Sequence, residues 1–141
     1  MTVTTVEHQE LKAQQGIRLA EDQLVIAIQD ALDKRQYGNL EESQFRNLVR
    51  VSTSTESTEV IKNFIRYQVG REDKWGKGKG SLAEQIILDI DNLVSKEAEA
   101  IAEQAGFPKK SAKSNEIKID LIRRYLGYGA RYLKYKREGG S

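Results

Sequence analysis

Apolar positions recur at spacings of three and four residues along most of the chain, which is the period of an α-helix. No segment alternates apolar and polar residues as a half-buried strand would. Short polar or glycine-containing stretches separate the periodic segments. The pattern therefore predicts an all-α fold, a compact bundle of about five helices. The expected helices span residues 17–36, 41–52, 55–69, 82–104 and 115–136.

Two helix starts have a recognisable capping pattern. Ser81 is followed three residues later by Glu84, the spacing of a capping box. Thr53 and Glu56 have the same spacing and predict the start of the helix at 55–69.

The length of 141 residues fits a single helical domain over residues 1–141. We expect residues 1–16 to be frayed and residues 137–141 to form a flexible tail. The longest aliphatic run is only Ile86 to Leu88, so we expect no membrane span, and no signal peptide is evident. The expected location is the cytoplasm.

The composition removes most catalytic and metal-binding chemistry. Cysteine is absent and His8 is the single histidine, so thiolate or histidine metal sites and nucleophilic triads are not expected. Asp89 and Asp91 are two apart on a predicted helix and point in different directions. We therefore expect no enzyme activity, no catalytic residues, no metal and no cofactor.

The charge is unevenly distributed, although the formal net charge is only +2. Residues 1–105 carry 13 Lys and Arg against 18 Asp and Glu, whereas residues 106–141 carry 10 against 3. This segregation is typical of a surface that binds a polyanion. It is equally compatible with lysines that only keep the protein in solution.

Basic residues recur at helical spacing in two of the predicted helices. Arg46 and Arg50 are four apart and share a helix face, and Arg124, Arg131 and Lys134 fall near one line. Gly127 and Gly129 lie between these last residues. Glycine is unfavourable inside a helix, so the pair indicates close approach either of another helix or of a sugar-phosphate chain.

Aromatic residues allow two interpretations. Trp75 lies in a basic, glycine-rich loop and could stack on a base, but packing on the core is favoured. The loop lacks the residue order of a nucleotide-triphosphate loop, because Lys79 precedes Gly80. The tyrosine stripe of the last helix could likewise bind bases, although the rim of a core is the favoured interpretation.

Three segments resemble the small subunit of type III CRISPR effector complexes. Leu40 to Leu48 resembles the family's helix opening, with Ser-Gln-apolar-Arg-Asn after a leucine. Phe64 to Arg71 resembles its aromatic helix ending in Tyr-x-x-Gly-Arg. Arg124 to Tyr135, followed by Gly139-Gly140, resembles its terminal helix. The order and rough spacing agree over about two-thirds of the chain.

The resemblance implies a helical, non-catalytic subunit of an antiviral ribonucleoprotein. Its expected partners are the backbone of the guide and target RNA, other effector subunits and copies of itself. Lys and Arg would hold the phosphates, and guide pairing would supply the specificity. The expected RNA-binding residues are Arg46, Arg50, Arg66, Arg71, Arg124, Arg131 and Lys134, with Lys74, Lys77 and Lys79 as mobile helpers.

Two other function classes remain open. The chain could be a helical protein-interaction adaptor with no nucleic-acid role, which would use exposed parts of its apolar and tyrosine stripes. A free-standing DNA-binding protein is the weaker alternative, since no helix-turn-helix is evident. Arg46 and Arg71 could also brace the bundle through an acid such as Glu42 or Asp73.

Overall fold

The computed structural model describes residues 5–139, and within that range it contains helices and no named strand. Because three of the helical segments run on as one continuous rod, the protein is an all-α bundle of five rods, as predicted. The segments are α1 (Thr5–Lys34), α2 (Glu42–Thr53), α3 (Thr58–Arg71), then α4 (Leu82–Asp89), the π-helical turn η1 (Ile90–Val94) and α5 (Ser95–Gln104) in one rod, and α6 (Ala112–Glu138).

The N-terminal helix is longer than the sequence pattern predicts. It begins at Thr5, so the expectation of a frayed segment is wrong for residues 5–16, while residues 1–4 lie outside the described range. Gln9 anchors this end through its side-chain amide, which donates to the carbonyl oxygen of Gly106 at 3.0 Å. A distant loop therefore stabilises a helical turn that has few buried apolar residues.

The C-terminal helix also extends beyond its predicted end. It continues to Glu138, and Arg137 Nε donates to the carbonyl oxygen of Leu40 at 2.9 Å. The expected flexible tail is therefore wrong for residues 137 and 138, and residues 140–141 lie outside the described range.

Of the two predicted helix caps, the one at Ser81 is confirmed and the one at Thr53 is not. Ser81 Oγ accepts from the backbone N–H of Glu84 at 3.1 Å and so starts α4. By contrast, α3 starts at Thr58 with Ser57 as its cap. The prediction from Thr53 is wrong because Thr53 ends α2, where its hydroxyl donates to the carbonyl of Arg50.

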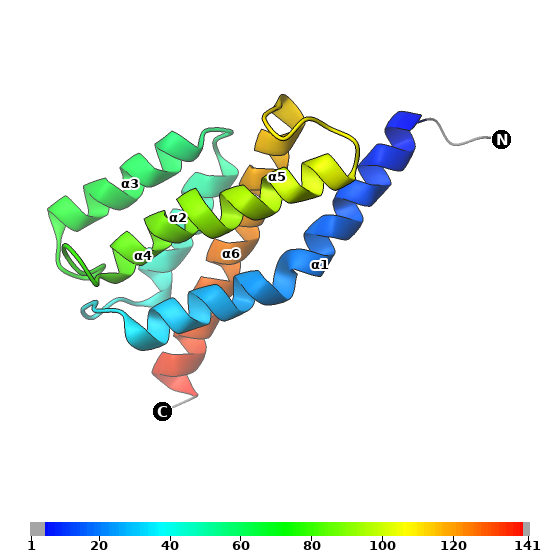
Figure 1. Ribbon diagram of the computed structural model, residues 1–141. Coiled ribbons are helices and arrows are strands. Elements are labelled where there is room, and N and C mark those ends of the chain that lie inside the picture. The colour runs from blue at the N-terminus through cyan, green and yellow to red at the C-terminus, as the bar shows by residue number, and fades with distance from the viewer. Residues whose placement is uncertain (1–4, 140–141) are drawn as a thin grey trace.

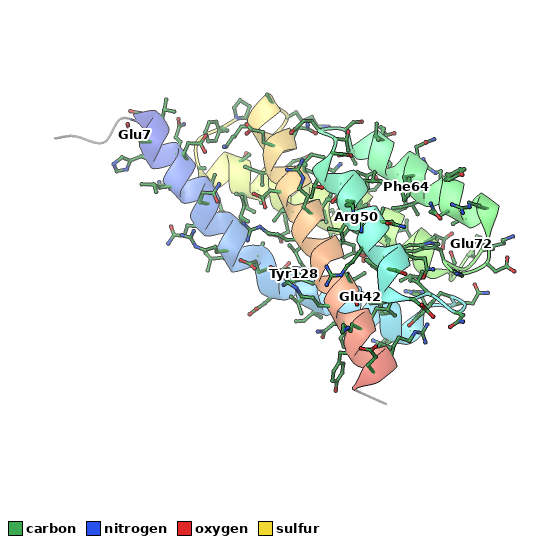
Figure 2. All side chains as sticks on the ribbon, turned by 180° about the vertical axis from the view of Figure 1, so that it is seen from behind. Glu7, Glu42, Arg50, Phe64, Glu72 and Tyr128 are labelled. Atoms are coloured by element: carbon green, nitrogen blue, oxygen red, sulfur yellow. The ribbon has the colours of Figure 1, made fainter. Side chains whose placement is uncertain are left out.

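The rods form two layers. In Figure 1, α1 and the α4–α5 rod lie in front of α6, and Figure 2 brings α6 and α2 to the front with α1 and α3 on either side. One cluster of buried apolar side chains joins the layers. At its centre α6 passes close to α1 and α2, since a Cβ on Gly129 would lie 2.6 Å from Phe45 and 2.8 Å from Ile28.

The glycine-rich loop after α3 is held by the backbone rather than left free. Gly38 N–H donates to the carbonyl oxygen of Lys74, and Gln36 N–H donates to that of Gly80. Gly76 adopts φ +80°, and a Cβ there would lie 2.3 Å from the carbonyl oxygen of Gln36. These contacts fix the course of the loop, so Lys74, Lys77 and Lys79 extend from a hydrogen-bonded backbone.

Candidate nucleic-acid interface

Acids of α1 and bases of α6 form a ladder of ion pairs. The two helices run in the same direction, and each pair joins residues 103 positions apart. The nitrogen–oxygen distances are 2.6, 3.1 and 2.7 Å for Glu10–Lys113, Glu21–Arg124 and Asp33–Lys136, respectively. Some of the acids in the first part of the sequence and some of the bases in the last part therefore pair with each other across α1 and α6.

Arg124 belongs to this ladder. Its Nε donates to Asp120 at 2.6 Å and its Nη1 donates to Glu21 at 3.1 Å. The hydrogen bond with Asp120 is the main cause that raises the pKa of Arg124 above its ordinary value. With one-third of the side chain exposed, this arginine is positioned to brace α6 against α1 rather than to reach a ligand.

Another arginine of α6 has a structural role that the sequence analysis missed. Arg123 donates to the carbonyl oxygens of Ser52 at 2.7 Å and Thr55 at 3.1 Å, across the end of α2. Its partners are backbone atoms about 70 residues away in the chain, at separations of 71 and 68 residues. No residue pattern identifies such partners, so the sequence carried no signal for this contact.

On the other side of α6, Glu42 links two of the predicted cations. Arg46 Nε donates to Glu42 at 2.6 Å, and Lys134 Nζ lies 3.6 Å from the other carboxylate oxygen. The hydrogen bond from Arg46 is the main cause that lowers the pKa of Glu42. Arg46 therefore has the acidic neighbour that the bracing alternative named, although half of its side chain stays exposed.

Arg50 lies on α2, one turn after Arg46. Figure 2 shows it on α2, with Glu42 on the same helix and Tyr128 on the neighbouring α6. Its Nη1 donates to Asn47 Oδ1 at 2.6 Å, a neutral partner that leaves the charge of the guanidinium uncompensated.

The exposed strip of α6 lies between the contacts with α1 and those with α2. Arg131 is exposed on this strip and has no hydrogen bond or ion pair within residues 5–139. Gly127 lies one turn earlier, and a Cβ on it would meet nothing within 4 Å. We define the α2–α6 face as Arg46, Arg50, Gly127, Arg131 and Lys134.

The remaining predicted cations form a separate group at the end of α3 and in the following loop. Arg71 lies over the ring of Tyr67 at 5.9 Å from its centroid, while Asp73 pairs with Lys77 at 3.0 Å. Figure 2 shows Glu72, which follows Arg71 directly, far from α6. The structure thus divides the ten predicted residues, and this second group consists of Arg66, Arg71, Lys74, Lys77 and Lys79.

The aromatic residues divide in a similar way. Trp75 is 1% exposed and packs 5.3 Å from the ring of Phe45, so the expectation that it joins the core is confirmed. Tyr125 is also fully buried. Tyr132 is half-buried and Tyr135 is 56% exposed, so the tyrosine stripe runs from the core to the surface.

The carboxylates of the α4–α5 rod diverge as the sequence predicts. Asp89 accepts from Tyr125 at 2.6 Å and from Gln85 at 2.8 Å, whereas Asp91 pairs with Lys62 at 2.9 Å. Burial is the main cause that raises the pKa of Asp89. Among residues 5–139, no group of three or more His, Cys, Asp or Glu side chains could hold a metal ion.

Comparison with known proteins does not assign a family. No family model, no curated protein and no solved structure matches the chain. Among the described helices, none is both long and apolar enough to cross a membrane.

Proposed function

We propose that this chain is a non-catalytic small subunit of a type III CRISPR ribonucleoprotein. In this role several copies stack in the cytoplasm alongside other subunits and bind the backbone of guide and target RNA during antiviral defence. The support is the resemblance of three segments, which fall at the start of α2, the end of α3 and on α6. The all-α fold agrees with such a subunit.

The observation that carries the proposal is the environment of Gly127. Glycine in a helix interior costs about 1 kcal/mol relative to alanine, and Gly129 offsets that cost by allowing close packing. Gly127 has no such packing neighbour. Arg131 follows it by one turn and has an unpaired guanidinium. The strip therefore combines a position without a side chain, where a sugar-phosphate chain can come close to the helix backbone, with a cation that can bind its phosphate.

The neighbouring cations suit the same ligand. Arg46 and Lys134 share Glu42, although Glu138 also lies 3.2 Å from Lys134. Arg50 adds a charge that is paired only with an amide. Together these side chains can bind successive phosphates through charge and several N–H donors, without reading bases.

A protein-interaction adaptor is the second candidate, favoured by an apolar strip on α1. Leu11, Leu19 and Ile26 recur at spacings of eight and seven residues and are 63%, 77% and 58% exposed. Large exposed apolar side chains along one helix are typical of a protein-binding surface. In the effector assembly the same strip would contact another subunit, so it does not by itself decide between the two functions.

The salt dependence of RNA binding tests the proposal. We expect the full chain to bind single-stranded RNA with an affinity that falls steeply with salt concentration. Arg131→Glu should weaken binding and reduce the slope of log K against log salt by about 0.7 for a lost phosphate contact. Lys96→Glu is the matched control, because Lys96 is exposed on α5 and its reversal changes the net charge equally.

Equal effects of the two substitutions would reject the α2–α6 face as the RNA site. Binding that does not depend on salt, or no binding by the wild-type chain at low salt, would favour the adaptor.

A further inference from the structure

A groove between α1 and α6 is lined by three tyrosine side chains. It has a volume of about 350 Å³ and opens beside Arg131. Its lining residues are Val25 and Gln29 on α1, and Tyr128, Arg131, Tyr132 and Tyr135 on α6.

Two of the rings are held in place by their hydroxyl groups. Tyr128 donates to Glu21, and Tyr132 donates to both carboxylate oxygens of Asp33 at 2.8 and 2.9 Å. Tyr135 stacks on Tyr132 with ring centroids 5.9 Å apart and an interplanar angle of 29°. The groove therefore has an aromatic wall whose rings are positioned before any ligand arrives, which limits the entropy lost on binding.

Two polar side chains of the groove have no partner. Neither the guanidinium of Arg131 nor the amide of Gln29 makes a hydrogen bond within residues 5–139. The two acids that hold the tyrosine hydroxyls are themselves paired, since Glu21 contacts Arg124 and Asp33 contacts Lys136, and among the described residues Arg131 is the one charged residue that lines the groove. The unpaired charge at the groove is therefore positive, which favours an anionic ligand over a cationic or purely apolar one.

We propose that this groove binds one unpaired nucleobase of an RNA strand together with its adjacent phosphate. The base stacks on the exposed ring of Tyr135, Arg131 binds the phosphate, and Gln29 hydrogen-bonds the edge of the base. Aromatic rings bind any base through its π-face, so this site adds affinity with little sequence preference. The inference rests on the proposed function, because the strand that crosses the α2–α6 face also supplies the base.

The combination of an aromatic ring, a guanidinium and an amide in the groove favours a nucleotide over a protein partner. An apolar side chain of a partner could fill the groove, but it would leave both Arg131 and Gln29 without a hydrogen-bond acceptor, which is unfavourable once water is excluded. A nucleotide offers acceptors to both and a flat ring to Tyr135.

The test compares binding of a twelve-residue oligoadenylate with binding of inorganic polyphosphate, which carries charge but no bases. Tyr135→Leu retains an apolar side chain and loses the aromatic ring, whereas Tyr135→Phe keeps the ring. Because Tyr135 is 56% exposed, both variants should fold, and circular dichroism checks this. We expect Tyr135→Leu to weaken oligoadenylate binding about tenfold, Tyr135→Phe to bind as the wild type does, and polyphosphate to bind all three chains equally.

The outcomes separate the two proposals. If Tyr135→Leu binds oligoadenylate as tightly as the wild type while binding stays salt-dependent, the groove inference is wrong and the RNA-binding function stands. If neither oligoadenylate nor polyphosphate binds the wild-type chain, both proposals fail. Loss of a protein partner in Tyr135→Leu, with unchanged oligoadenylate binding, would assign the groove to that partner and overturn the inference.

Discussion

At the scale of single residues, two glycines of α6 that are alike in sequence have opposite environments. Gly129 faces Phe45 and Ile28 at distances that leave no room for a side chain, whereas Gly127 faces open space. The sequence predicts that both mark a close approach, but it leaves open what approaches. Only the packing distinguishes Gly129, where the neighbouring helices leave no room for a side chain, from Gly127, where a Cβ would meet nothing within 4 Å.

This difference leads to a prediction about stability and binding. Gly127→Ala should raise the free energy of unfolding by about 0.5–1 kcal/mol, because alanine is the better helix former and meets no neighbour. Gly127→Gln should fold as well as the wild type while weakening RNA binding severalfold, because its side chain covers the strip. Chemical denaturation and RNA titration measure the two effects.

Gly129→Ala is the matched control. It should lower the free energy of unfolding by about 1–3 kcal/mol, since its Cβ would overlap Phe45. If Gly127→Gln binds RNA as the wild type does, then this position does not lie under the RNA strand.

Several residue environments were predictable from local patterns, and several were not. Ser81 and Trp75 were assigned correctly because a helix cap depends on neighbouring residues and a large aromatic side chain in a small bundle usually packs. Arg123 and Arg124 could not be distinguished from binding residues. Their distant partners lie on α1 and at the C-terminal end of α2, and the sequence does not show which face of α6 meets which helix.

At the scale of elements, α6 is held by polar contacts on two sides besides its apolar core. The ladder to α1 explains why the first helix starts at Thr5 and not at residue 17, because Lys113 pairs with Glu10 in the extra turns. The apolar pattern alone is weak over residues 5–16, so sequence analysis predicted fraying. The stabilising contact comes from a partner more than 100 residues away in the chain.

The link between α4 and α6 predicts a pH dependence of stability. The pKa of Asp89 is raised in the folded protein, mainly by burial, although Tyr125 and Gln85 donate hydrogen bonds to it. The folded state therefore binds this proton more tightly than the unfolded state. The contribution of Asp89 to the free energy of unfolding is therefore fully present at low pH. It decreases as the pH rises from the ordinary pKa of 3.8 through the raised pKa of the folded protein.

Asp89→Asn removes this titration while keeping a side chain that can hydrogen-bond both neighbours. We expect the Tm of Asp89→Asn minus that of the wild type to increase as the pH is raised from 4 to 7, because only the wild type loses stability through this group. Thermal denaturation across this range measures it. A constant difference would show that burial of the charged carboxylate does not control stability here, and Asp91→Asn provides a control at the ion pair with Lys62.

At the scale of the whole molecule, part of the uneven charge distribution pairs one helix with another. The acidic first part and basic last part of the sequence suggested a polyanion surface, and the ladder shows that some of this charge joins α1 to α6. The other cations that the sequence analysis singled out lie on the α2–α6 face, at the end of α3 and in the loop that follows it. The fold class was predictable because it depends on periodicity, whereas the division of cations depends on the arrangement of the rods.

A tagged pull-down from the native cell tests the central claim most directly, with the co-purifying RNA and proteins both identified. We predict short RNAs of uniform length that share a repeat fragment, together with larger subunits and several copies of this chain. A single partner protein without RNA would contradict the claim, and the α1 strip of Leu11, Leu19 and Ile26 would then be the surface to examine.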